Sequence, residues 1–174
     1  MINCPAIMIT RFGGVGPVTG IHLTRLRADG TGKADVEKPK IMLGPSQGEP
    51  IIVHDNPERL DLFISEGIED AASIAVATGS TCWAAGSAGR IAALMPLTRG
   101  FDNLFIAADD DFAGRRALRR AGEIRPDVVH LKFANGADAN EMIRQSGADT
   151  ITASIDASFN RGRAAVTSHL KDAA

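Results

Sequence analysis

Short apolar runs alternate with helix-favouring segments from about residue 59 onward, and this alternation constrains the fold more than any other feature. The apolar runs have the length of strands and cover residues 62–65, 82–84, 104–107 and 128–133. Segments of helical composition follow them in turn, at residues 69–78, 87–95, 112–123 and 139–145. Alternation of this kind is typical of βαβ units. The sequence therefore predicts an α/β fold with a parallel sheet of about four strands and helices on both faces.

The N-terminal part of the chain has a different texture. Five of the eight prolines fall within the first 50 residues, and short β-prone runs lie between them, at residues 6–12, 18–26, 41–43 and 51–53. Proline and glycine at this density interrupt helices and favour short antiparallel strands joined by turns. We therefore expect a small β-rich subdomain at 1–58, the α/β domain at 59–150, and a polar C-terminal tail at 151–174 with helical composition near 164–170.

Charge and cysteine content exclude several classes of protein. Nineteen Lys and Arg against 21 Asp and Glu give a net charge of −2, which excludes nucleic-acid binding by bulk positive charge but not by a local basic face. Cys4 and Cys82 form no CxxC pair, so they cannot build a zinc ribbon, and they favour a reducing compartment. No signal peptide begins the chain, and its longest uncharged stretch is broken by glycines. We expect a cytoplasmic protein without membrane association.

Acidic or small residues follow each of the four predicted strands. Glu66 follows the first strand, Gly86 and Ser87 follow the second, and Asp109-Asp110-Asp111 follows the third. The segment from Gly136 to Glu141, which includes Asp138, follows the fourth. Ligands of open parallel sheets bind at the carboxyl ends of the strands, so these residues are expected to meet at one edge.

Asp109 and Asp111 are separated by one residue, so both point the same way if the backbone between them is extended. Two neighbouring carboxylates repel each other, and a hard divalent cation such as Mg²⁺ relieves that repulsion. Glu66 would then complete the cluster or remain free as a general acid or base. The alternative interpretation is a solvated acidic turn that caps the following helix.

Two further features of the sequence are suited to binding phosphate groups. Gly86 and Ser87 begin a predicted helix, where backbone N–H groups can approach an anion, although an ordinary serine N-cap has the same residues. The predicted helix at 112–123 gathers Arg115, Arg116, Arg119 and Arg120 on one arc beside the acidic triplet. This arc suits nucleotide phosphates or a nucleic-acid backbone, and a solvated surface is the alternative.

Four segments, in this order, resemble a Toprim domain, and they are most similar to the Toprim domains of phage- and plasmid-type DNA primases. They are Leu62–Ala71, Trp83–Ser87, Ile106–Arg115 and Gly136–Glu141, and the resemblance covers about residues 59–147. The upstream segments Pro5–Ile7, Gly20–Thr24, Gly32–Ala34 and Pro39–Pro45 resemble the region before Toprim in mobile-element primases.

The resemblance implies a Rossmann-like Toprim fold with a function in DNA replication. It implies that Glu66, Asp109 and Asp111 bind Mg²⁺ or Mn²⁺ and catalyse nucleotidyl transfer, that Glu66 also moves a proton, and that Asp138 assists with the metals. The candidate residues for binding substrate phosphate are Gly86, Ser87, Lys33, Lys40, Arg115 and Arg116.

The resemblance further implies primer synthesis on single-stranded DNA, with single-stranded DNA and nucleotides as partners. Related sequences often carry Lys where this chain has Ala137. The zinc-binding and helicase-like modules of such primases are not recognisable here, so we expect a helicase or a zinc-binding primase module on another chain.

Two other functions remain open at this stage, and two more are disfavoured. A Toprim-type nuclease and a non-catalytic Toprim-like module that binds nucleic acid or a partner protein are both compatible with the motifs. A topoisomerase is disfavoured because the chain has no tyrosine. A receiver-like phosphoacceptor domain is disfavoured because a lone Glu66 follows the first strand, where such domains place an acidic pair.

Overall fold

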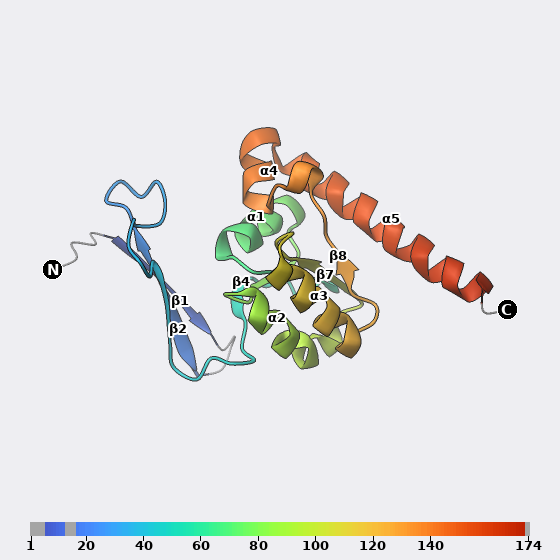
Figure 1. Cartoon of the computed structure of the whole chain (residues 1–174), viewed down its shortest axis with the longest axis horizontal. Helices are drawn as coiled ribbons and strands as arrows, with labels where there is room; N and C mark the ends of the chain where they lie inside the picture. Colours follow the sequence, from blue (N-terminus) through green and yellow to red (C-terminus); the bar gives the residue numbers. More distant parts are fainter. Residues whose placement is uncertain (1–5, 13–16, 173–174) are drawn as a thin grey trace. The chain divides into compact units, whose positions relative to one another are not determined.

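A computed structural model describes residues 6–12 and 17–172 of the 174-residue chain, with side chains for 17–134 and 136–161. The chain folds into two compact units, Met1–Ile51 and Ile52–Ala174 (Figure 1).

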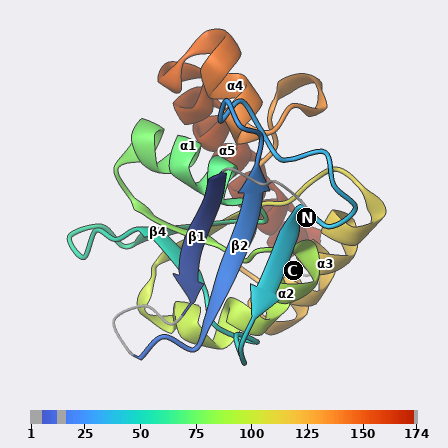
Figure 2. The same ribbon diagram turned by 90° about the vertical axis from the view of Figure 1, so that its left-hand side faces the viewer.

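The N-terminal unit is built on a three-stranded antiparallel sheet, as the prolines and β-prone runs predicted. Its strands are β1 (Ala6–Phe12), β2 (Gly20–Leu26) and β3 (Lys40–Leu43), with β2 in the middle (Figure 2). A turn centred on Asp29 and Gly30 extends β2, because an antiparallel bridge joins Leu26 to Lys33 beyond it. The Asp29 carboxylate accepts hydrogen bonds from the backbone N–H and the hydroxyl of Thr31, which stabilises this turn.

The second unit is built on a five-stranded sheet. Its strands are β4 (Ile51–His54), β5 (Asp61–Ser65), β6 (Thr81–Ala84), β7 (Asn103–Ala107) and β8 (Val129–His130), in the order β4-β6-β5-β7-β8. β5 pairs in parallel with β6 and β7, and β7 pairs in parallel with β8. The predicted parallel α/β fold is confirmed. The sheet has one strand more than the expected four, because β4, which we had grouped with the N-terminal strands, joins it beside β6.

Two groups of helices flank this sheet (Figure 1). α2 (Ala88–Leu94) packs against α3 (Phe112–Ile124), while α1 (Ile68–Thr78) packs against α4 (Ala139–Ser146) and α5 (Ala148–Asp172). Short 3₁₀ turns cover Met95–Gly100 and Ala134–Gly136. α5 begins well before the helical segment expected at 164–170.

The core lies on both faces of the central strands. Leu62, Ile64, Leu104 and Ile106 are fully buried, and the rings of Phe63 and Phe105 stack with their centroids 4.6 Å apart. Trp83 is a core residue, as predicted, with 7% of its surface exposed. Its neighbour Cys82 is a free, buried cysteine, and burial raises the pKa of its thiol to about 12. No helix within the described ranges is long and apolar enough to cross a membrane.

The strand order places a switch point at β5. The chain passes from β5 to β6 on one side and then to β7 on the other. In open α/β sheets the crevice for ligands forms where the strand order reverses in this way, outside the carboxyl ends of the strands. The residues that follow β5, β6 and β7 therefore surround this point.

Candidate functional site

Glu66 lies at the switch point, directly after β5, and backbone groups of the neighbouring strand ends surround it. The backbone N–H of Asp109, after β7, donates to Oε1 of Glu66 at 3.3 Å. The backbone N–H of Gly86, after β6, donates to the Glu66 carbonyl at 3.0 Å. Gly86 has a φ of +84°, a conformation that glycine adopts without strain. Three consecutive strand ends of the sheet therefore meet at Glu66.

The Glu66 carboxyl group is half-buried, and this raises its pKa above the ordinary value. Burial is the largest cause, and the negative charges of Asp109 and Asp111 add to it. Hydrogen bonds from the backbone N–H groups of Asp109 and Ala88 oppose the shift without cancelling it. A carboxyl group with a raised pKa, held near other carboxylates, is suited to accept and release a proton.

The acidic triplet does not follow strand alternation, because β7 ends at Ala107 and the triplet lies in a loop. Asp109 and Asp110 line the same pocket, while Asp111 caps α3, where its Oδ1 accepts the Gly114 N–H at 2.7 Å. The expectation that Asp109 and Asp111 point the same way assumed an extended backbone between them, whereas the chain bends at Asp110 and Asp111, and only Asp109 of the two lines the pocket. Asp111 still lies near enough to Glu66 to raise its pKa.

Gly114 fixes the position of this loop. A Cβ atom at residue 114 would lie 2.0 Å from the carbonyl oxygen of Asp109, which is far inside van der Waals contact. The loop can therefore press against the first turn of α3 only because residue 114 has no side chain.

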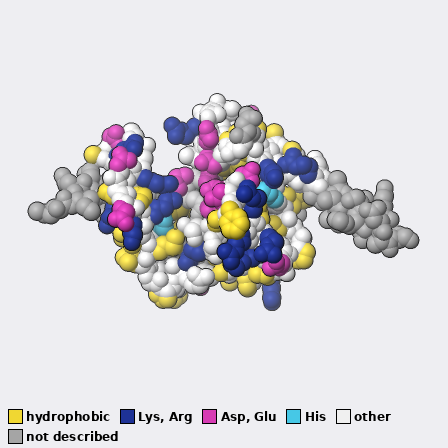
Figure 3. Space-filling view, in the orientation of Figure 1, with side chains coloured by type: hydrophobic (Ala, Val, Ile, Leu, Met, Phe, Trp, Pro, Cys, Tyr) yellow, Lys and Arg dark blue, Asp and Glu magenta, His cyan; other side chains and the backbone are white. Residues whose placement is uncertain are grey.

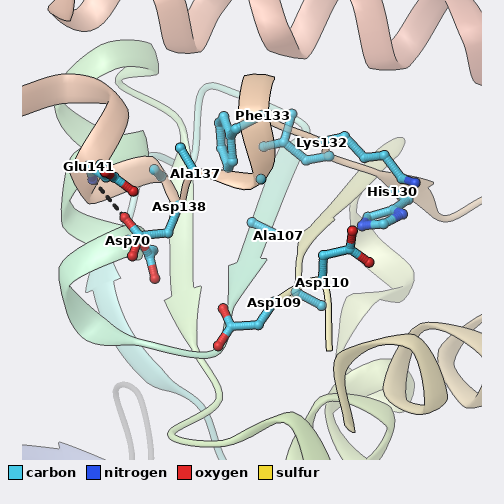
Figure 4. A pocket seen from close by; sticks show the side chains of 14 residues that line it. Asp70, Ala107, Asp109, Asp110, His130, Lys132, Phe133, Ala137, Asp138 and Glu141 are labelled. Carbon is cyan, nitrogen blue, oxygen red and sulfur yellow. Dashed lines mark hydrogen bonds between the residues drawn. The ribbon is translucent and has the colours of Figure 1, made fainter. Parts of the chain in front are cut away.

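A pocket with a volume of about 270 Å³ lies beside the acidic loop (Figure 4). Asp70 and Asp138 lie next to each other at one side, Asp109 faces the same space, and Asp110 lies near His130. Asp138 caps α4, accepting the Glu141 N–H at 2.6 Å, and Asp70 accepts the Asn140 N–H at 3.0 Å. These bonds hold two carboxylates from different helices at the same pocket.

Asp70 is a pocket residue that sequence reasoning missed. Burial, together with the charges of Asp138, Asp109 and Glu69, raises its pKa to about 6, and the Asn140 hydrogen bond opposes this shift. Asp70 lies in the first turn of α1, four residues after Glu66. The available signal in the sequence was the position of Asp70, four residues after Glu66, which follows a strand. The sequence alone did not show that α1 directs the Asp70 carboxylate into the pocket.

Positive charge at this pocket comes from Lys132, which sequence reasoning also missed and which follows β8. Lys132 and burial together lower the pKa of His130, with burial the larger cause, while Asp110 opposes them. Ala137, which stands where related sequences often carry Lys, also lines the pocket and is half-buried.

The residues predicted to bind phosphate lie in four different places. Arg115 is paired with Asp110 at 3.0 Å, whereas Arg116 lines a different groove, between α2 and α3. Ser87 caps α2 without a side-chain hydrogen bond, next to Gly86 and close to Glu66. Lys33 and Lys40 belong to the N-terminal unit.

The chemistry of this site fits a divalent cation. Within the described ranges, no three His, Cys, Asp or Glu side chains are already arranged to hold a metal ion. Mg²⁺, however, is usually bound by one or two carboxylates together with water and substrate phosphates, rather than by a complete protein cage. Asp70, Asp109 and Asp138 offer only oxygen donors around one pocket, which is the donor set that Mg²⁺ and Mn²⁺ prefer.

Several solved DNA primases share this fold. The chain is 16% identical to the primase fragment of the bacteriophage T7 primase-helicase protein, with a TM-score of 0.60 over 86% of this chain and 62% of that one. It is 19% identical to the DnaG catalytic core (TM-score 0.65, covering 84% of this chain and 50% of that one). It is 22% identical to a primase domain from Pseudomonas aeruginosa (TM-score 0.61, 84% and 49%). The chain thus spans less than two thirds of each of these relatives.

Family models match both parts of the sequence. Residues 2–53 match a domain of unknown function, DUF7146. No curated protein matches the sequence. Residues 61–149, just over half of the chain, match the Toprim domain and contain every acidic residue of the site, so the chain belongs to the Toprim domain family.

Proposed function

We propose that this chain is the catalytic core of a DNA primase, a metal-dependent nucleotidyltransferase that synthesises primers on single-stranded DNA. The observation that carries the proposal is that Asp70, Asp109 and Asp138 line one pocket of a Toprim sheet, and that Glu66, at the switch point, accepts a hydrogen bond from the Asp109 N–H beside it. The primase structures that share the fold support the same reaction class.

Glu66, Asp109, Asp111 and Asp138, together with Asp70, are the proposed ligands for Mg²⁺ or Mn²⁺. When bound, the cation neutralises triphosphate charge and lowers the pKa of an attacking 3′-hydroxyl. Glu66, with its raised pKa, accepts the proton that the 3′-hydroxyl releases. Lys132 lies at the rim of the pocket and meets negative charge on the nucleotide phosphates. Positioning and charge neutralisation supply most of the rate in such reactions.

The test is a primer-synthesis assay with labelled nucleotides, run beside a parallel reaction with end-labelled single-stranded DNA, both in the presence of Mn²⁺ or Mg²⁺. Glu66→Gln and Asp109→Asn should each lower product formation by at least about 100-fold, because a proton acceptor or a charge-neutralising ligand is lost. Glu58→Gln is the matched control, since Glu58 is an exposed residue of the same unit and lies outside the pocket. It should retain full activity.

Each result of this assay has a distinct meaning. Products that require intact Glu66 and Asp109 support a polymerising primase core. Shortened DNA that forms with the wild type but with neither variant would mean that the chain is a Toprim nuclease instead. Equal activity in the wild type and both variants would refute the assignment of the site.

The related primases include parts that this chain does not match, and these parts indicate the partners that we propose. It spans 50% of the DnaG catalytic core and 62% of the T7 primase fragment. Another neighbour is a primase from Aquifex aeolicus with zinc-binding and RNA polymerase domains. We propose that the chain acts together with a zinc-binding primase module or a helicase. Adding such a module in trans should raise primer yield on single-stranded DNA.

A further inference from the structure

A second recess lies outside the acidic pocket, between α2 and α3. It is a groove of about 150 Å³, and most of the residues that line it are small: Ala88, Gly89, Ala92, Ala113 and Ala117. Phe112, Arg116 and Arg120 complete its lining. None of the eight residues belongs to the proposed metal site.

Phe112 is unusual for an aromatic side chain, because 76% of its surface is exposed. It is the first residue of α3 and directly follows Asp111, so the groove begins beside the acidic loop. Burying an aromatic ring is strongly favourable, and a ring left exposed at the rim of a recess is typical of a contact surface.

Two arginines extend from this ring along α3. Arg116 and Arg120 are one and two helical turns beyond Phe112, so the three side chains share one face, about 6 Å apart along the axis. The other arginines of the helix are engaged, Arg115 with Asp110 and Arg119 with Glu123. Among the described residues, Arg116 and Arg120 have no ion pair or hydrogen bond. Figure 3 shows basic, hydrophobic and acidic side chains gathered in the region of α3.

We propose that this groove binds single-stranded nucleic acid, with one base stacked on Phe112 and the backbone phosphates held by Arg116 and Arg120. An aromatic face next to a row of cations is the arrangement that single strands favour, because every base has a stackable face and every nucleotide a negative charge. The small residues that line the groove leave room for a flat base. This inference rests on the proposed function, since it assigns a path for the strand on which that reaction takes place.

The first test measures binding, not catalysis. The full chain is titrated against a fluorescein-labelled oligothymidine in EDTA, followed by anisotropy. Phe112→Ala should weaken binding by about 5- to 100-fold, the usual effect of losing one base-stacking ring. Arg116→Ala and Arg120→Ala should each reduce the salt slope of log K by about 0.7, as expected for one phosphate contact on a single strand.

Matched controls separate the groove from the general surface. Val76→Ala removes another hydrophobic side chain, 74% exposed on α1, and Arg119→Ala removes a paired arginine of the same helix. Both should bind the oligonucleotide like the wild type. Gly89→Leu should block the groove without harming the fold, because a Cβ at residue 89 meets no atom within 4 Å. Its melting temperature should not fall, while its affinity should fall like that of Phe112→Ala.

A tryptophan variant reports base stacking directly, through its own fluorescence. Phe112→Trp keeps a larger stacking surface, and its indole fluorescence should be quenched when oligothymidine binds. Trp83 is buried and supplies a constant background. Val76→Trp serves as the control and should show no quenching. A duplex of equal length should compete poorly, because its base faces are already stacked on one another.

The outcomes separate this inference from the proposed function. Weakened binding in Phe112→Ala and Gly89→Leu, with normal binding in Val76→Ala and Arg119→Ala, supports the groove whether or not the chain makes primers. Wild-type affinity in Phe112→Ala, Gly89→Leu and both arginine variants would overturn the inference, even if primer synthesis is intact. Unquenched Phe112→Trp at saturating oligonucleotide, or equal affinity for duplex, would overturn it as well.

Discussion

The two sheets of this protein are built on different physical principles. In the C-terminal unit, β5 buries Leu62, Phe63 and Ile64, so its strands are covered on both faces by apolar packing. In the N-terminal unit, the buried positions of β2 are Gly20, His22 and Thr24, and none is a large apolar side chain. The parallel sheet is stabilised by its apolar core, whereas the N-terminal sheet is stabilised by the hydrogen bonds between its antiparallel strands and by its turns.

This difference bears on function, because a catalytic site needs strand ends that do not move. The packed centre of the parallel sheet fixes the ends of β5, β6 and β7, and with them Glu66, Gly86 and Asp109. Among the side chains that the structure describes, the N-terminal sheet has no such core, and a sheet of this kind is better suited to adjust to a bound partner. Each of the following predictions tests one side of this contrast.

The largest expected effect comes from a cavity in the parallel sheet. Ile64 is 0% exposed in the central strand, so Ile64→Ala should lower the free energy of unfolding by about 2–5 kcal/mol. Met42 in β3 is 36% exposed, and Met42→Ala should leave the unfolding of the C-terminal unit unchanged. Urea unfolding followed by Trp83 fluorescence measures that unit. A shifted Trp83 transition in Met42→Ala would show that the two units unfold as one.

Glycine substitutions should disturb the two units separately. Gly114→Ala forces a Cβ against the Asp109 carbonyl, which should cost about 1–3 kcal/mol and displace the acidic loop. Gly44, with a φ of +90°, would bring its Cβ within 2.6 Å of the Thr19 carbonyl, so Gly44→Ala should damage the N-terminal unit. Trp83 fluorescence should report the first change and far-UV circular dichroism the second. A stable, fully active Gly114→Ala would contradict the close contact.

A smaller, pH-dependent effect is expected at Asp70. Its pKa rises from 3.8 in the unfolded chain to about 6 in the fold. The folded state therefore favours the protonated acid, and the stability that this provides is present below about pH 4 and is lost as the pH rises through 6. Asn mimics the protonated form and can still accept the Asn140 hydrogen bond. Asp70→Asn should therefore become increasingly stable relative to the wild type between about pH 4 and pH 7.5.

Thermal melts in the absence of divalent cations measure this trend. Asp55→Asn is the control, because Asp55 is exposed and lies outside the pocket. A difference in melting temperature between Asp70→Asn and the wild type that stays constant with pH would show that Asp70 is not the group responsible.

The smallest effect is expected at the surface of the N-terminal unit. Arg27 and Asp35 form an exposed ion pair at 3.0 Å. Exposed pairs of this kind contribute little, because water and salt screen them. Arg27→Ala should leave the melting temperature unchanged within error. A measurable loss that disappears at high salt would mean that this pair holds the β2 extension in place.

The sequence predicted most of the parallel sheet, because strands buried on both faces are continuous apolar runs. The runs at 62–65, 82–84 and 104–107 correspond to β5, β6 and β7 with small differences at their ends. The run at 51–53 was recognised as a strand, but its residues do not encode which sheet it joins. The start of α5 was missed because Thr150, Ile151 and Thr152 are β-branched, and the packing of α5 against α1 and α4 outweighs that preference.

The site was predictable to the extent that it lies at strand ends. Glu66 and Asp109 follow strands, so the rule for parallel sheets located them. Asp70 could not be found in this way, because it reaches the pocket from a helix. The arrangement of Asp110 and Asp111 was also out of reach, since it depends on where β7 stops and on the capping of α3.

Buried Cys82 makes this protein a convenient reporter of its own opening. A thiol with a pKa near 12, enclosed in the middle of the core, does not react with alkylating reagents while the sheet is closed. In a Cys4→Ser background, the rate of Cys82 modification would count the occasions on which β6 separates from its neighbours. This rate would show how often the sheet opens during the time that one turnover of the proposed reaction takes.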